Sequence, residues 1–173
     1  VLFFINTLGC GGAETVLVET ANSLDRKKYD VTVQTITDTG VNKQKLVPHI
    51  KYKSINRCRN PVLKYIWTQI VMKLLGAKYI YRFFVQDNYD YEIAFLEGWP
   101  TKVISHSTNK NAKKYAWVHT DLNAFPDSYR AYGSEQKEGE AYRRFDRIFC
   151  VSECARSELQ KKYRLDENKL RVV

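Results

Sequence analysis

Four short segments of the chain carry groups that could do chemistry, and each follows an apolar run. In chain order they are Gly9-Cys10-Gly11-Gly12-Ala13-Glu14, Glu97-Gly98, His119-Thr120-Asp121 and Ser152-Glu153. Ligands of parallel sheets bind beyond the carboxyl ends of the strands. If the apolar runs are strands of one sheet, these segments are therefore the candidates for a binding or catalytic site.

The glycine-rich segment is suited to contact with a phosphate. Gly11 and Gly12 bring backbone N–H groups to the start of a predicted helix without side chains in the way. The alternative is that the glycines only let the helix pack closely on a strand. The dinucleotide fingerprint G-x-G-x-x-G is incomplete, because Glu14 stands where the third glycine belongs. A nucleotide- or dinucleotide-binding module stays open, with Asp38 as its ribose ligand.

Each of the other three segments offers a polar group with a structural alternative. Glu97 could contact a substrate or be a surface carboxylate, and His119 could be catalytic or a satisfied loop histidine. Ser152 could contact a substrate or only cap the helix that follows it. Their roles depend on whether the fold brings them together.

The cysteines indicate neither a metal site nor a disulfide framework. Cys10, Cys58, Cys150 and Cys154 form no C-x-x-C pair, and no histidine lies near the last two. We expect no metal and no cofactor.

Apolar periodicity predicts strands that alternate with helices. Strands are expected at residues 1–5, 29–37, 50–55, 91–96, 114–118, 147–151 and 169–173, and helices at 13–24, 61–85, 99–105, 133–145 and 152–163. Gly76 is expected to break the long helix in two. This alternation predicts an α/β fold, a Rossmann-like three-layer domain with a mostly parallel sheet. We expect the 173 residues to form one domain.

The charge is concentrated in one stretch of the chain. Ten of the 28 basic residues lie between Thr39 and Gln86, where there is no acidic residue. This pattern favours an anionic partner, with a solvated basic face as the alternative. No nucleic-acid motif is present, so we expect no nucleic acid. The predicted helix at 61–85 has apolar residues beyond its main stripe, which favours contact with an anionic membrane. The alternative is a helix buried all round.

No apolar run reaches the roughly 18 residues that span a bilayer, and the start of the chain lacks the pattern of a signal peptide. We therefore expect a cytoplasmic protein, with a peripheral position on the inner membrane face as a further expectation.

Several motifs stand in a fixed order along the chain: Phe3-Phe4-Ile5-Asn6, Gly11-Gly12-Ala13-Glu14, Tyr29-Asp30-Val31-Thr32-Val33, Tyr91-Glu92-Ile93-Ala94-Phe95-Leu96-Glu97-Gly98, Trp117-Val118-His119-Thr120-Asp121 and Phe145-Asp146-Arg147-Ile148-Phe149-Cys150-Val151-Ser152-Glu153. As a set they resemble the N-terminal half of the family 4 retaining glycosyltransferases. That family has the GT-B fold, in which two Rossmann-like halves face each other across a cleft.

The resemblance implies that residues 1–173 form the acceptor-side domain and that the donor-binding domain is absent from this chain. The parent would transfer a sugar from a nucleotide-sugar donor to a saccharide or lipid-linked acceptor, with retention, in surface polysaccharide synthesis. Its catalytic residue here would be His119, which would hydrogen-bond the transferred sugar. The substrate-binding residues would be Gly11, Gly12, Glu97, Gly98 and Ser152. Thr15 stands where the family often has a basic residue.

Overall fold

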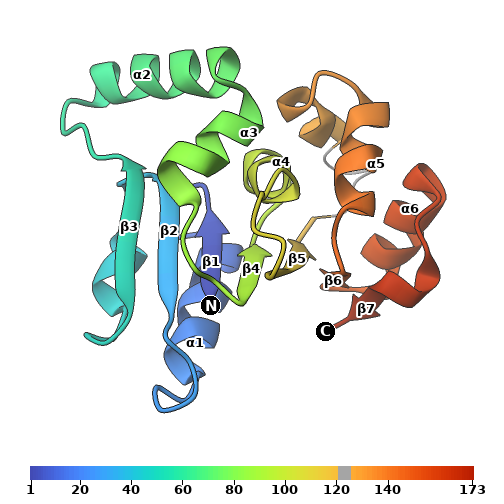
Figure 1. Ribbon diagram of the computed structural model, residues 1–173, viewed down its shortest axis with the longest axis horizontal. Helices are drawn as coiled ribbons and strands as arrows, with labels where there is room; N and C mark the ends of the chain where they lie inside the picture. The colour runs from blue at the N-terminus through green and yellow to red at the C-terminus, as the bar shows by residue number, and fades with distance from the viewer. Residues whose placement is uncertain (121–125) are drawn as a thin grey trace.

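The computed structural model describes residues 1–120 and 126–173, and these residues form one sheet of seven strands (Figure 1). All of its neighbouring strands run parallel. The expected α/β class and parallel sheet are therefore confirmed, with strand ends shifted by a few residues. The strands are β1 (Leu2–Ile5), β2 (Thr32–Thr37), β3 (Lys51–Asn56), β4 (Tyr91–Ala94), β5 (Lys113–Val118), β6 (Arg147–Cys150) and β7 (Leu170–Val172).

The strand order reverses next to β1. The order across the sheet is β3-β2-β1-β4-β5-β6-β7. Strands β2 and β3 are therefore added on one side of β1, and strands β4 to β7 are added on its other side. In doubly wound sheets, ligands bind beyond the carboxyl ends of the strands at such a reversal. The crevice between the ends of β1 and β4 is thus the expected binding place.

The central strands are buried on both faces. In β1, Leu2 and Phe4 point into one apolar cluster, and Phe3 and Ile5 point into the other. Such a continuous apolar run is typical of a parallel strand covered on both sides. The packing therefore explains why the run at residues 1–5 shows no alternation.

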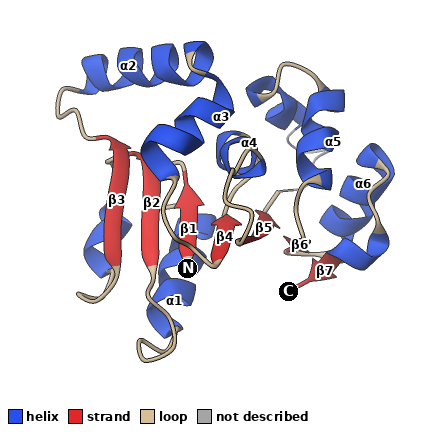
Figure 2. Ribbon diagram, in the orientation of Figure 1, coloured by secondary structure: helices blue, strands red, loops and turns tan. Residues whose placement is uncertain are grey.

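In the described ranges, six α-helices connect the strands (Figure 2). The expected break in the long helix is confirmed, because Gly76 has φ +71° and begins a separate helix. A π-helical turn, Tyr81–Val85, then leads toward β4. The helices are α1 (Gly12–Ser23), α2 (Pro61–Leu74), α3 (Gly76–Ile80), α4 (Trp99–Ser105), α5 (Glu135–Arg143) and α6 (Glu153–Tyr163).

The two faces of the sheet are covered unequally. Helices α3 to α6 and Met72 of α2 pack on one face, whereas in the described part of the chain α1 is the only α-helix that contributes to the cluster on the other face. It does so through Leu17, Val18 and Ala21 and lies behind β1 to β3 in Figure 1. On the same face, Tyr91 and Val151 remain exposed. The third layer therefore covers only part of the sheet.

Helix α2 has its apolar stripe on the outside. Asn60 caps its first turn by accepting from the amides of Val62 and Leu63. The only fully buried side chain of this helix is Met72. No helix of the described residues is long and apolar enough to cross a membrane. The side chains of the predicted main stripe that α2 exposes are Val62, Leu63, Ile66, Trp67, Ile70 and Leu74.

We expect Gly40→Ala to destabilise the fold more than Gly133→Ala. Both glycines have positive φ, +118° and +87°, so alanine is strained at either position. A Cβ at Gly40 would also lie 1.8 Å from the carbonyl oxygen of Leu8, whereas a Cβ at Gly133 would meet nothing within 4 Å. Urea unfolding should show a loss of about 3 kcal/mol at Gly40 and about 1 kcal/mol at Gly133. Equal losses would contradict the close approach of Gly40 to Leu8.

Candidate functional site

The fold brings the four candidate segments to one edge of the sheet. They follow β1, β4, β5 and β6, which are consecutive strands in the sheet order. Because neighbouring strands lie about 4.8 Å apart, the ends of these four strands span only about 15 Å. The first two segments follow β1 and β4, the strands between which the strand order reverses. Sequence separation alone gave no measure of this proximity.

The glycine turn leaves the start of α1 uncovered. Gly11 and Gly12 are exposed, and Gly11 provides no side-chain cap for the amides of the first turn. A Cβ at Gly12 would meet no atom within 4 Å, so the space next to this backbone is free. The helix dipole and uncapped amides favour an electronegative ligand group at this position.

Two other side chains fix the shape of the turn. Asn42 is buried and its amide donates to the carbonyl oxygen of Gly9 at 2.5 Å, and the Thr15 hydroxyl donates to the carbonyl oxygen of Gly11 at 3.0 Å. Sequence reasoning missed Asn42, because an asparagine in a polar loop gives no signal of its own. The structure shows that it connects the turn to the loop after β2.

Glu14 limits what the turn can bind. A Cβ at Gly11 would lie 2.3 Å from the Oε2 atom of Glu14, so this carboxylate folds back over the turn. A carboxylate favours the helix N-terminus but repels a phosphate placed directly on it. A ligand phosphate must therefore displace the Glu14 side chain or approach beside it.

His119 lies against two aromatic rings at the end of β5. Its ring centroid is 4.9 Å from that of Phe95 and 6.0 Å from that of Trp117, to which it is nearly parallel. Its Nε2 atom is buried and has no hydrogen-bond partner among the described residues. Burial lowers the pKa of His119 to about 4, so the imidazole is neutral near pH 7. A neutral imidazole can donate or accept one hydrogen bond from a substrate hydroxyl.

Glu97 holds the backbone that carries His119. The Oε1 atom of Glu97 accepts from the amide of His119 at 2.6 Å, and from the amide and the hydroxyl of Thr120 at 2.7 and 2.8 Å. Its residue is only 8% exposed, and its Oε2 atom has no partner among the described residues. Burial raises the pKa of the Glu97 carboxyl. The three hydrogen-bond donors lower this pKa, but burial has the larger effect. Glu97 is therefore a buried clamp on the loop after β5 rather than a surface carboxylate.

The remaining predicted residues lie nearby. Gly98 has φ +77° and turns the chain from Glu97 into α4. The hydroxyl of Ser152 accepts from the amide of Ala155 at 3.1 Å, so Ser152 does cap α6 as one of its two interpretations predicted. Asp121, the last residue of the His119 motif, lies outside the described residues.

Asp38, the ribose ligand of the dinucleotide alternative, already has partners. Its carboxylate accepts from the ammonium of Lys43 at 2.9 Å and from the hydroxyl of Tyr52 at 3.0 Å. The Lys43 hydrogen bond lowers the pKa of Asp38 despite partial burial. A ribose would have to compete with both groups, so the structure gives this alternative no support.

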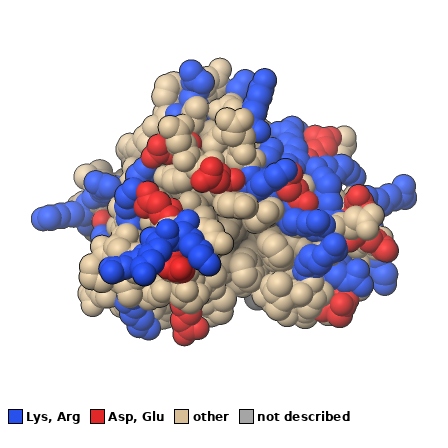
Figure 3. All heavy atoms as spheres, turned by 60° about the horizontal axis from the view of Figure 1, so that its bottom comes forward, with Lys and Arg blue, Asp and Glu red and all other residues tan. Residues whose placement is uncertain are grey.

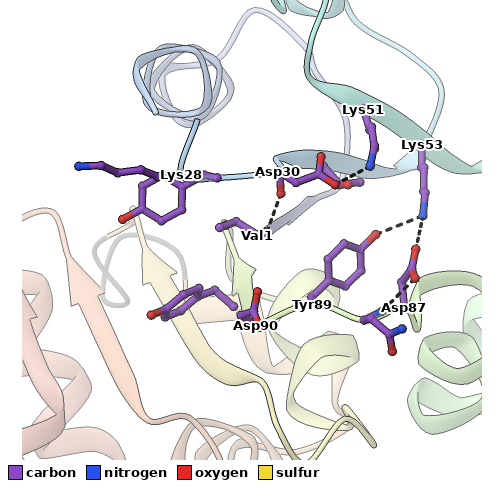
Figure 4. Close-up of a pocket in the computed structure, with 12 residues that line it drawn as sticks. Val1, Lys28, Asp30, Lys51, Lys53, Asp87, Tyr89 and Asp90 are labelled. Carbon is purple, nitrogen blue, oxygen red and sulfur yellow. Dashed lines mark hydrogen bonds and ion pairs between the residues drawn. The ribbon is translucent and has the colours of Figure 1, made fainter. Parts of the chain in front are cut away.

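A hollow of about 380 Å³ lies at the opposite, amino-end edge of the sheet. Four of its charged side chains form ion pairs, Lys51 with Asp30 and Lys53 with Asp87, and Lys53 also donates to the hydroxyl of Tyr89 (Figure 4). Acidic and basic side chains are also interspersed over the surface in Figure 3. No group of three or more potential metal ligands occurs in the described ranges. Lys28 and Asp90 line the hollow as well, so it carries charges of both signs and does not select an anion or a cation.

Sequence reasoning missed two buried carboxylates that lie outside the four candidate segments. Glu92 accepts from the hydroxyl of Tyr81, and Glu138 accepts from the hydroxyl of Tyr163, each at 2.6 Å. Both are fully buried. They connect the π-helical turn to β4 and α6 to α5, which indicates a structural role.

Comparison with known proteins agrees with this architecture. The crystal structure of Anabaena Alr3699/HepE in complex with UDP superposes on 99% of this chain with a TM-score of 0.60 at 18% sequence identity. The chain spans 43% of that structure, so it corresponds to one half of a GT-B fold. No curated protein sequence matches the chain significantly.

The family model described as Glycosyltransferase Family 4 matches residues 10–173, which include every candidate segment except Gly9. The chain therefore belongs to glycosyltransferase family 4.

Proposed function

We propose that the whole protein transfers a sugar from a nucleotide-sugar donor to a saccharide acceptor with retention at the anomeric carbon. The observation that supports this most directly is the meeting of the glycine turn, Glu97 and His119 at the reversal of the strand order in a family 4 domain. HepE, the matching structure, was solved with UDP. A uridine diphosphate sugar is therefore the first donor to test.

The chain's own residues suggest a division of labour within this site. Gly11 and Gly12 would offer backbone amides to a phosphate oxygen or an acceptor oxygen, since the space beside Gly12 is free and the Glu14 carboxylate beside Gly11 would move aside. The neutral imidazole of His119 would hydrogen-bond the transferred sugar. Gly98 and Ser152 would line the acceptor side, and Glu97 would keep the loop of His119 in place. Preorganised donors of this kind stabilise the charge that develops on a leaving diphosphate.

We further propose that residues 1–173 are the acceptor-side half and that a second domain supplies most of the donor pocket. The coverage of 43% of the HepE chain supports this division. The chain alone would then lack one wall of the catalytic cleft.

The proposed acceptor is a saccharide of surface polysaccharide synthesis, carried on a lipid. The enzyme would act at the cytoplasmic face of the membrane that holds this lipid. The concentration of basic residues between Thr39 and Gln86 supports such a position.

The proposal predicts that His119→Ala strongly reduces sugar transfer and that His119→Phe does not restore it. Loss of the imidazole should lower kcat/KM about 100-fold in the complete protein, measured with labelled UDP-sugars. Phenylalanine keeps a ring against Phe95 and Trp117, so it should recover the Tm that alanine loses. Recovery of activity by phenylalanine would show that the ring only packs.

His119→Phe should also change the stability of the chain in acid. The pKa of His119 is about 4 in the folded state against an ordinary value of 6.5, so the unfolded chain binds the proton more readily. The wild type should therefore lose stability relative to the phenylalanine variant as the pH falls from 6.5 to 4. A difference that does not change with pH would contradict the buried neutral imidazole.

Gly12→Val should reduce transfer strongly without destabilising the domain. Its Cβ meets nothing within 4 Å, and valine is a better helix residue than glycine, so the free energy of unfolding should not fall. The branched side chain would instead fill the space through which a ligand reaches the amides. Kinetics should show a smaller effect for Gly12→Ala than for valine. Full activity of the valine variant would mean that the turn only permits packing.

For Glu97 we expect alanine to be far more damaging than glutamine. Alanine removes the acceptor of three donors, which should cost about 3 kcal/mol of stability and lower kcat/KM. The amide oxygen of glutamine can still accept, so Glu97→Gln should keep most of the activity. In NMR spectra, the backbone amide chemical shifts of His119 and Thr120 should change far more in Glu97→Ala than in Glu97→Gln. Equal loss of activity in both variants, with unchanged amide shifts in glutamine, would assign Glu97 to substrate contact instead.

A further inference from the structure

The segment 62–84 exposes an unusual amount of apolar surface. Eleven of the eighteen exposed large apolar side chains in the described part of the chain belong to it. The most exposed are Leu74, Phe83 and Tyr65, at 78, 68 and 67%. Scattered single apolar residues are normal on a protein surface, whereas a contiguous group marks an interaction site. The group, which we term the apolar arm, consists of Val62, Leu63, Tyr65, Ile66, Trp67, Ile70, Leu74, Leu75, Tyr79, Phe83 and Phe84.

The apolar arm is held in place by the inward side of α2, where Met72 packs in the core and polar bonds add to it. The buried Asn56 side chain donates to the carbonyl oxygen of Lys64 and to the hydroxyl of Thr68, both at 2.9 Å. The ammonium of Lys64 donates to the carbonyl oxygen of Asp38 at 2.8 Å. These bonds tie one face of α2 to the carboxyl ends of β2 and β3. The opposite, apolar face is consequently fixed outward, which reverses the usual orientation of an amphipathic helix.

The unpaired charges on the stretch that carries the arm are all positive. Among the basic residues between Thr39 and Gln86, Lys43, Lys51 and Lys53 already pair with aspartates. Five others are exposed and form no ion pair with a described residue: Arg57, Arg59, Lys73, Lys78 and Arg82. The stretch has no acidic residue to neutralise them.

We propose that the apolar arm inserts into the surface of a bilayer that contains anionic lipid. Apolar and aromatic side chains would enter the boundary between headgroups and acyl chains, and the five cations would contact lipid phosphates. Trp67, Tyr65 and Tyr79 are residue types that favour this interface. An apolar surface on a stretch whose own charged side chains are all cations matches an anionic lipid surface better than a protein surface of mixed charge.

The arm also orients the candidate site. Helix α2 follows the carboxyl end of β3 and lies at the carboxyl-end side of the sheet, the same side as the glycine turn and His119 (Figures 1 and 2). Insertion of the arm would therefore turn the candidate site toward the membrane. The idea that insertion brings a lipid-linked acceptor to the site rests on the proposed transferase function. The insertion itself does not depend on that function.

Liposome co-sedimentation of this chain tests the proposal without any sugar transfer. We expect binding to vesicles of phosphatidylcholine with 30% phosphatidylglycerol. Vesicles of phosphatidylcholine alone should bind at least tenfold less. The triple substitution Tyr65→Ser, Leu74→Ser and Phe83→Ser should weaken binding at least tenfold with an unchanged Tm, because these side chains are largely exposed. The matched control, Tyr29→Ser with Val41→Ser, removes exposed apolar side chains elsewhere and should bind like the wild type.

A charge-matched pair of variants tests the cations. Changing Arg57, Arg59, Lys73, Lys78 and Arg82 to glutamine should abolish the preference for anionic vesicles. Changing five exposed basic residues elsewhere, Arg26, Lys27, Lys110, Arg144 and Lys161, should leave the preference in place. Trp67 fluorescence should shift to the blue on binding only where the apolar arm is intact, with Trp99→Phe and Trp117→Phe in the background.

Two results would overturn the proposal. One is the absence of binding to anionic vesicles at low salt. The other is self-association through the arm, seen as a dimer in sedimentation equilibrium that the triple serine substitution dissociates while vesicle binding is absent. A complete wild-type protein that binds anionic vesicles but transfers no sugar would contradict the proposed function. It would leave the membrane proposal unaffected.

Discussion

The reversal of the strand order beside β1 is the constraint on which the rest of this structure depends. Strand β1 pairs with β2 on one side and with β4 on the other. The connection after the carboxyl end of β1 and the connection after the carboxyl end of β4 therefore lead away from each other. Connections that diverge in this way leave a crevice in doubly wound sheets, which is the expected binding place. The glycine turn needs this opening, since exposed amides at Gly12 are useful only if a ligand can reach them. The Glu97 loop lies on the other side of the same opening.

Within this crevice the structure stabilises its polar groups by hydrogen bonds instead of ion pairs. The Glu97 carboxylate accepts three donors of the next loop, and the His119 imidazole is kept neutral by burial against Phe95 and Trp117. Both arrangements are formed before any ligand arrives, which reduces the reorganisation that binding or catalysis requires. Glu14 is the exception, because its carboxylate lies over the glycine turn and has to yield to an anion.

The orientation of α2 shows how polar anchoring can override apolar periodicity. The stripe of Val62, Ile66 and Ile70 would ordinarily pack on the sheet. Here Asn56 and the backbone near Asp38 bind the opposite side of the helix, so the stripe faces outward. The apolar surface that the fold leaves open on α2 therefore lies beside the candidate site.

The sequence by itself determined the alternation of strands and helices, the break at Gly76 and the four candidate segments, because apolar periodicity, glycine and capping residues act over a few neighbouring residues. It also offered the helix cap as one of two interpretations of Ser152, since that bond spans three residues. Only the tertiary structure decided that Glu97 binds the loop of His119, that Asn42 supports the glycine turn and that the stripe of α2 faces outward. These outcomes depend on contacts between residues far apart in the chain, whose distances follow from strand order and register, and local patterns carry no record of either.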